Sequence, residues 1–158
     1  MVLIKFIHLL SLVVWLGGMI FFSFIAAPSI FKMLPRETAG DVVGNIFPKY
    51  WMLGYICSIT ALATLLILSF QEKAYPWARI GLLVLMTALV FYSGKVIGKN
   101  ATEVKAQIRA TEDQAQKESL RLKFKAIHRK SMILNAVILI LGMTVLFLTA
   151  YALRYSER

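Results

Sequence analysis

The hydrophobic stretch from Phe6 to Phe31 constrains this chain more than any other feature of its sequence. Its 26 residues carry no charged side chain. A helix of that length is about 39 Å long, enough to cross a hydrocarbon layer of about 30 Å with some tilt. The stretch lacks the basic start, short apolar core and Ala-x-Ala exit of a cleaved signal peptide. We therefore interpret it as a retained membrane helix.

Three further apolar runs, at residues 52–70, 80–98 and 132–153, are each about as long as a spanning helix. Of the 158 residues, 59% are hydrophobic and 16% are charged, which is typical of a small polytopic membrane protein and not of a soluble domain. The sequence therefore predicts an all-α fold. We expect a single membrane domain, residues 1–158, built as a bundle of four transmembrane helices.

The distribution of basic residues predicts the orientation of this bundle. Of the eighteen Lys and Arg residues, thirteen lie in the first and third loops, and the other side holds Lys5, Lys73, Arg79, Arg154 and Arg158. The positive-inside rule then places loops one and three in the cytoplasm and both termini outside, in a bacterial inner (plasma) membrane. Because the charges are confined to the gaps between apolar runs, the net charge of +10 indicates anionic lipid as a partner and not nucleic acid.

Two of the loops have internal patterns. The first is bracketed by Pro35 and Pro48, and Thr38 with Asp41 resembles a capping box, so we expect a short helix lying at the interface. The third has helical spacing of apolar residues and no Gly or Pro. It predicts a helical extension at about 99–130 that turns near Thr111, with Thr111 and Gln114 as a cap. The alternative is an amphipathic helix lying flat on anionic lipid.

The sequence contains few groups capable of catalysis. It has no phosphate-binding glycine loop, no nucleophile elbow and no histidine pair at ligand spacing, and its eight carboxylates all lie outside the predicted spans. The single cysteine, Cys57, excludes an internal disulfide. These absences speak against most enzymes and proton pumps, and we do not expect an enzyme.

His8 lies inside the first predicted span, where an unpaired imidazole would be costly. One interpretation is structural, with a hydrogen bond to Tyr151, Thr149 or Gln71. The other is functional, with His8 as an axial ligand to haem or a ligand to a soft metal ion.

His128 lies before the fourth span, with Met132 four residues on and on the same helical face. With Met52 at a similar depth, these side chains offer nitrogen and thioether ligands to a soft ion such as Cu(I), although methionine is also a common core filler. About 30 Å of helix separates the depths of His8 and His128, so one chain cannot use both on one ion. We expect Lys95 to extend to the headgroups and Asn135 to bond between helices.

Four motifs together resemble the transmembrane protein 205-like family, a four-span membrane domain of unknown function. They are His8-Leu9-Leu10, LPRETAG at 34–40, FPKYW at 47–51 and HRKSMILN at 128–135. Members of that family have been linked to export of, or resistance to, platinum drugs and heavy metals. Arg129 departs from the family pattern, which usually has glycine there. The resemblance implies a signature of His8, Arg36, Phe47, Pro48, Tyr50, His128, Ser131 and Asn135.

The first helix alone has a second resemblance. His8 with Trp15, followed by Gly17-Gly18, is similar to the copper-resistance D family and to the bacterial membrane protoporphyrinogen oxidase. In that enzyme a first-helix histidine ligates haem b. The resemblance implies a haem site of His8, Trp15 and Lys95.

Three functions are therefore open. The first is transport of, or resistance to, metal ions or small solutes, and the second is a haem b-binding redox protein that uses His8. The third is a non-catalytic accessory or assembly subunit in a homo-oligomer or a larger membrane complex. The glycines and alanines of the first span would allow the close helix packing that any of these needs.

Overall fold

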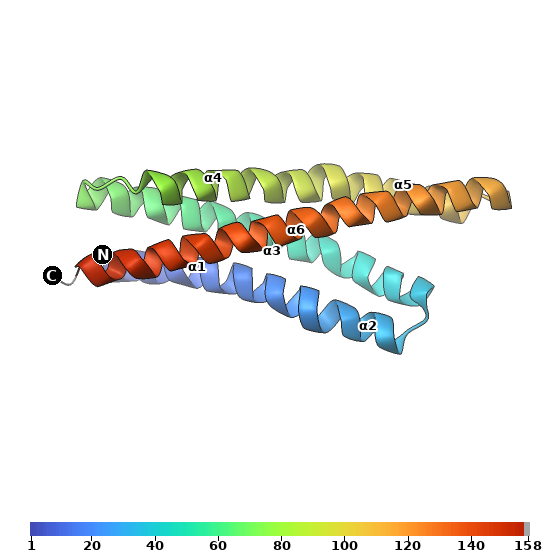
Figure 1. Cartoon of the computed structure of the whole chain (residues 1–158), viewed down its shortest axis with the longest axis horizontal. Helices are drawn as coiled ribbons and strands as arrows, with labels where there is room; N and C mark the ends of the chain where they lie inside the picture. Colours follow the sequence, from blue (N-terminus) through green and yellow to red (C-terminus); the bar gives the residue numbers. More distant parts are fainter. Residues whose placement is uncertain (157–158) are drawn as a thin grey trace.

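Four long helical segments, antiparallel to their chain neighbours, make up this protein, for which the computed structural model describes the backbone of residues 1–156 and the side chains of residues 1–152 (Figure 1). The predicted all-α four-helix bundle is confirmed. Within the described residues there is no strand, and each of the four segments is long and apolar enough to cross a membrane. Arg154 and Arg158, counted above for orientation, lie outside the described side chains.

The first and third segments each change helix type part-way, whereas the second and fourth are continuous. The first segment consists of α1 (Val2–Phe21), a π-helical turn η1 (Phe22–Ala26) and α2 (Ala27–Met33). The second is α3 (Arg36–Glu72). The third consists of α4 (Trp77–Tyr92), a π-helical turn η2 (Ser93–Gly98) and α5 (Lys99–Ala110), and the fourth is α6 (Gln114–Ser156).

The predicted interfacial helix in the first loop is wrong, because α3 starts at Arg36 and continues without a break into the second span. Pro48 lies inside this helix. A proline removes one backbone hydrogen bond, but neighbouring helices in a bundle can support the helix around it. The capping box is wrong as well. Pro35 precedes α3, and the Asp41 carboxylate pairs with α5 instead.

The third loop forms the predicted hairpin, with its turn at residues 111–113. The cap differs from the prediction. Asp113, not Thr111, caps α6, because its carboxylate accepts hydrogen bonds from the backbone N–H groups of Ala115 (3.3 Å) and Gln116 (3.1 Å). The Thr111 hydroxyl donates back to the Gln107 carbonyl. Because α6 is one unbroken helix of 43 residues, the hairpin continues the bundle and is not a separate helix lying across it.

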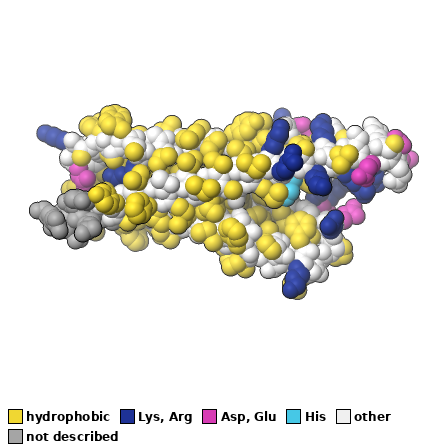
Figure 2. Space-filling model, viewed as in Figure 1, with side chains coloured by type: hydrophobic (Ala, Val, Ile, Leu, Met, Phe, Trp, Pro, Cys, Tyr) yellow, Lys and Arg dark blue, Asp and Glu magenta, His cyan; other side chains and the backbone are white. Residues whose placement is uncertain are grey.

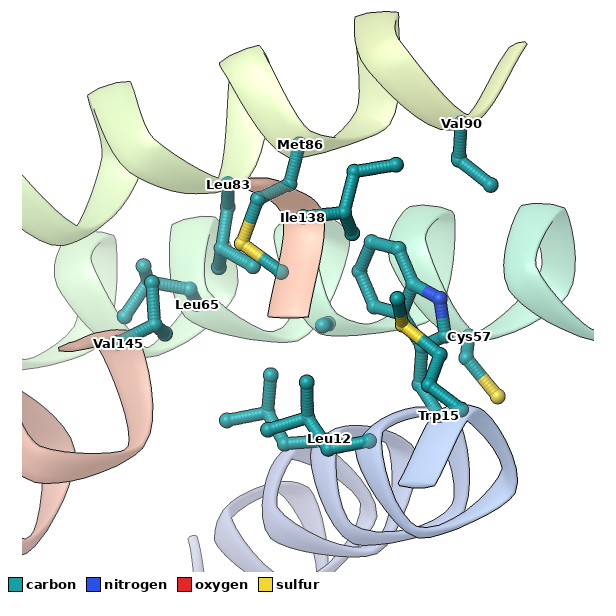
Figure 3. Close-up of a cluster of buried hydrophobic side chains, with 12 residues drawn as sticks. Leu12, Trp15, Cys57, Leu65, Leu83, Met86, Val90, Ile138 and Val145 are labelled. Carbon is teal, nitrogen blue, oxygen red and sulfur yellow. The ribbon is translucent and has the colours of Figure 1, made fainter. Parts of the chain in front are cut away.

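The core lies where α1, α3, α4 and α6 cross (Figure 3). Trp15 is the largest of its side chains, and both Trp15 and Met86 are almost fully buried. Trp15 and Val90 pack against Gly54, and a Cβ at Gly142 would collide with Leu16. The members of the core cluster are Leu12, Trp15, Leu16, Met19, Cys57, Ala61, Leu65, Leu83, Met86, Val90, Ile138 and Val145.

The close packing expected at Gly17–Gly18 is provided elsewhere. A Cβ at Gly17 would meet no atom within 4 Å, and one at Gly18 would make only an ordinary contact of 3.4 Å with Leu53. The tight approaches are instead on the helices that face α1 or α3, at Gly54, Gly94, Gly98 and Gly142. Glycines therefore do enable close helix packing here, but not the two glycines of the first helix.

Apolar side chains cover most of the outer surface, and basic side chains gather at one end (Figure 2). Exposed Phe, Ile, Leu and Met side chains along all four segments suit contact with lipid acyl chains. We call the end with the α2–α3 and α5–α6 turns the hairpin end, and the end with both termini and the α3–α4 turn the termini end. At the hairpin end the two helical hairpins splay apart (Figure 1).

Candidate functional site

His8 lies near the termini end and is almost fully buried between α1 and α3. Its Nδ1 is 3.0 Å from the Ala61 carbonyl oxygen and 3.0 Å from Thr64 Oγ1. A carbonyl oxygen only accepts, so Nδ1 carries the proton and donates it. The Thr64 hydroxyl donates to the Thr60 carbonyl at 2.7 Å, which leaves its oxygen free to accept from His8.

The other imidazole nitrogen has no such partner. Among the buried side-chain nitrogen and oxygen atoms of the described residues, His8 Nε2 alone lacks a hydrogen bond within the protein. With the proton on Nδ1, Nε2 of a neutral imidazole is an acceptor with a free lone pair. A buried acceptor without a partner costs about 1–3 kcal/mol, a cost that a hydrogen bond from a water or a ligand would remove.

A cavity of about 260 Å³ lies beside His8. It is lined by α1, the end of α3, the α3–α4 turn, the start of α4 and α6, and it is open on one side. The wall is mixed, with apolar side chains toward the core and polar and charged ones toward the end of the bundle. The residues that line it are Lys5, His8, Leu9, Leu65, Leu68, Ser69, Glu72, Ala74, Tyr75, Pro76, Arg79, Thr149 and Ala152.

The charges on the cavity wall do not cancel. Lys5 Nζ pairs with Glu72 Oε1 at 2.9 Å. Arg79, half-buried at the start of α4, forms no ion pair with any described residue. The wall therefore carries one uncompensated positive charge. Positive charge on the wall opposes a bound cation.

A second polar cluster lies toward the hairpin end. The Tyr50 hydroxyl donates to Asn135 Oδ1, and Asn135 Nδ2 donates to Ser23 Oγ at 3.0 Å. These three side chains join η1, α3 and α6, so Asn135 bonds between helices as predicted. Aromatic rings surround the cluster, with centroids of neighbouring rings 5.2–6.1 Å apart: Phe22, Phe47, Tyr50 and Trp51.

Comparison with known proteins identifies the family. Residues 10–110 match the model of the domain of unknown function DUF4149, which is more than half of the chain. The chain belongs to this family. The match includes Arg79 and the Tyr50 region but begins two residues after His8 and ends before Asn135. It does not establish membership of the transmembrane protein 205-like family.

A relative of this DUF4149 chain is an uncharacterized protein from Aquifex aeolicus (strain VF5), which is 52% identical over 48 residues. That alignment covers 30% of this chain and 35% of the relative, so it spans about a third of the relative's length. No solved structure matches.

The predicted partners of His8 are corrected by the structure. Nδ1 bonds to α3, through Ala61 and Thr64, whereas the sequence had suggested Tyr151, Thr149 or Gln71. Thr149 does lie on the wall of the same cavity, but its hydroxyl donates to the Val145 carbonyl at 2.8 Å. Depth along a helix can be counted from the sequence, but which neighbouring helix faces a side chain cannot.

The three residues of the predicted haem site lie apart in this DUF4149 structure. Trp15 is buried in the apolar core and does not line the cavity beside His8. Lys95 is exposed in η2, toward the hairpin end. The cavity is also below the range of about 300–1,000 Å³ typical of pockets for drug-sized ligands. The residues present do not fit a haem, and we derive no chemistry from one.

The residues of the predicted metal site are all exposed. His128 stacks on Phe124 with ring centroids 6.4 Å apart, and the side chains of Met132 and Met52 are 53% and 56% exposed. Within the described part of the chain, no three His, Cys, Asp or Glu side chains form a group able to hold a metal ion.

The family signature is only partly brought together. Phe47, Tyr50 and Asn135 meet in the second polar cluster, whereas Arg36 and Pro48 are exposed. Ser131 is half-buried on α6, one turn before Asn135.

Sequence reasoning missed most of the cavity around His8. The sequence pattern places Lys5 and Arg79 only among the charges outside the spans and does not single out Thr64 or Ser69. One signal was present. Lys5 and His8 are three residues apart, so they share a helical face, and a buried face that carries a cation needs a polar environment.

Proposed function

We propose that this DUF4149 protein binds a small polar solute in the cavity at its termini end and handles that solute at the membrane, in transport or resistance. The observation that carries the proposal is His8 Nε2, a buried acceptor with no protein partner beside a cavity of about 260 Å³. A site of this kind, with mostly apolar walls and a few placed polar groups, is the usual form of a small-molecule site.

The wall charges favour a solute over a metal ion. Lys5 and Arg79 are cationic, and Glu72, the one carboxylate among the lining residues, is already paired with Lys5. A cation would need to displace that pair and then remain close to two positive side chains.

The cavity would open to the outside in the orientation expected from the positive-inside rule. Below it lies the apolar core, including Leu12, Leu65 and Val145, which are almost fully buried. A solute that crosses the protein therefore needs the helices to separate at this layer, through a hinge or shear motion. Binding is the step that the cavity itself supports.

The test is the thermal unfolding of the detergent-purified protein with a panel of small solutes. The panel contains glycolate, acetate, glycerol, choline and Zn²⁺, so it includes anionic, neutral and cationic chemistry. A ligand that binds only the folded state stabilises it by about 2.7 kcal/mol at a hundred times its Kd, and we expect at least one solute to raise the Tm in this way.

The control is His8→Asn. The Asn side-chain amide can still donate to the Ala61 carbonyl in place of Nδ1–H but has no acceptor at the Nε2 position. We expect this variant to fold with a nearly unchanged Tm and to lose the response to the solute. The proposal fails if no member of the panel raises the Tm of the wild-type protein, or if His8→Asn responds as strongly as the wild type.

A further inference from the structure

We infer that the solute is a small monoanion that carries its own hydrogen-bond donor, such as a hydroxycarboxylate. This inference rests on the proposed function and adds the chemical class of the ligand. It follows from the charge on the cavity wall, from the donors and acceptors there, and from the cavity volume.

The net charge of +1 on the cavity wall would be balanced by one negative charge on the ligand. Lys5 and Glu72 pair at 2.9 Å. Arg79 lies within electrostatic range of the same Glu72 carboxylate but forms no ion pair with any described residue. A half-buried guanidinium is costly without an anion, and it can hold a carboxylate through two parallel hydrogen bonds. A cation would add to the excess charge, whereas a dianion would reverse it.

The free hydrogen-bonding atoms of His8, Ser69 and Thr149 on the cavity wall are acceptors, so the ligand needs a hydrogen-bond donor. His8 Nε2 only accepts when Nδ1 carries the proton. The hydroxyls of Ser69 and Thr149 already donate to the carbonyls of Leu65 and Val145, both at 2.8 Å, so their oxygens too can only accept from a ligand. A plain carboxylate such as acetate satisfies Arg79 and leaves His8 Nε2 unpaired.

The volume limits the size of the ligand. At about 30 Å³ of liquid volume per water molecule, a cavity of about 260 Å³ has room for roughly eight to nine waters. A hydroxycarboxylate of two or three carbons fits in this volume together with a few waters.

The first experiment compares matched ligands by thermal unfolding of the full chain in detergent. Glycolate and acetate have the same charge and differ by one hydroxyl, glycerol supplies hydroxyls without charge, and inorganic phosphate at pH 6 is a second monoanion with donors. We expect glycolate to bind at least tenfold more tightly than acetate in the wild type and no better than acetate in His8→Asn. The phosphate arm distinguishes an organic from an inorganic source of the same chemistry.

Each outcome has one meaning. Equal affinities for acetate and glycolate overturn the need for a donor, and a preference for glycerol, choline or Zn²⁺ overturns the need for an anion. The proposed function survives these outcomes if the response to the polar solute is lost in His8→Asn, whereas a preference for Zn²⁺ contradicts it. If nothing in the panel binds, the proposed function fails and this inference fails with it.

The second experiment measures the charge of the cavity without a ligand. Ser69→Cys, in a Cys57→Ala background, places a thiol on the wall, and the anionic sulfonatoethyl and the cationic trimethylammonioethyl methanethiosulfonates are compared. We expect the ratio of the anionic to the cationic reaction rate to be about tenfold higher than at Gln71→Cys, which is exposed and outside the cavity. Arg79→Gln should remove the difference, and an equal ratio at both positions would overturn the inference.

Discussion

At the scale of single residues, His8 combines two roles in one side chain. Nδ1 joins α1 to α3 through the Ala61 carbonyl and Thr64, and Nε2 is left for a partner that the protein does not provide. The first role fixes the tautomer and so makes the second nitrogen an acceptor. Under the proposed function, a structural role and a ligand-binding role for this histidine are therefore compatible.

The two nitrogens can be separated by substitution. We predict that His8→Gln lowers the free energy of unfolding by about 1–3 kcal/mol, because its amide lies nearer the Nε2 position and leaves the Ala61 and Thr64 acceptors without their donor. His8→Asn should lose less than half as much. Thermal unfolding of both variants in the same detergent checks this, and equal losses would show that the bond to α3 contributes little.

Asn135 is a second residue whose side chain joins neighbouring helices. We predict a coupling energy of about 0.6–1.7 kcal/mol between Tyr50→Phe and Asn135→Leu, the range found for polar contacts between membrane helices. Tyr50→Phe keeps the ring contacts with Phe22 and Phe47 and removes only the hydroxyl that donates to Asn135. A double-mutant cycle measures this energy, and strictly additive losses would contradict the hydrogen bond.

At the scale of elements, the α3–α4 turn contains the one non-glycine residue with a positive φ in the described chain, Lys73, at φ 50°. Its backbone N–H closes α3 by donating to the Ser69 carbonyl. A left-handed residue at a helix C-terminus favours glycine, because a Cβ there costs about 1 kcal/mol.

We therefore predict that Lys73→Gly raises the free energy of unfolding by about 0.5–1 kcal/mol. Lys73→Ala is the matched control, since it removes the same charge but keeps the Cβ. Thermal unfolding of the pair checks the prediction, which is contradicted if Lys73→Ala stabilises the protein as much as Lys73→Gly does.

The helices themselves could be predicted because their apolar runs are long and their interruptions few. The residues at which the helices begin and end could not be predicted. Pro48 looked like the end of a helix but lies inside α3, since a proline in a packed bundle loses one backbone hydrogen bond and not the helix. Asp41 looked like a capping residue, but its partners Lys105 and Arg109 are more than sixty residues away. Contacts between helices depend on how each is rotated, which the sequence pattern leaves open.

At the scale of the whole molecule, the hairpin end splays apart, and α3 and α5 are joined there by charged groups. Lys105 Nζ lies 2.6 Å from Asp41 Oδ1 and donates to the Gly40 carbonyl at 2.9 Å, and Arg109 pairs with the same carboxylate. Gly44 leaves room on α3 for this lysine, since a Cβ there would lie 3.3 Å from Lys105 Nζ.

We predict that Asp41→Lys widens the splay, because it replaces these attractions with repulsion from Lys105 and Arg109. Spin labels at Glu37→Cys and Glu112→Cys, in a Cys57→Ala background, report the distance between the two hairpin turns. The distribution should shift to longer distances and broaden. Adding Lys105→Glu and Arg109→Glu should restore it, whereas an unchanged distribution would show that packing alone holds the hairpins.

The two π-helical turns distinguish the first and third helical segments from the second and fourth. α3 and α6 are unbroken rods of 37 and 43 residues, whereas the first and third segments each contain a turn of wider hydrogen bonding, at Phe22–Ala26 and Ser93–Gly98. Such a turn can bend when a few backbone hydrogen bonds exchange partners, and a continuous helix cannot do so as cheaply. Both turns contact the same stretch of α3, at Tyr50, Trp51 and Tyr55. The two π-helical turns and Pro48 of α3 thus lie at one level of the bundle, so bending there would move the hairpin end while leaving the walls around His8 in place.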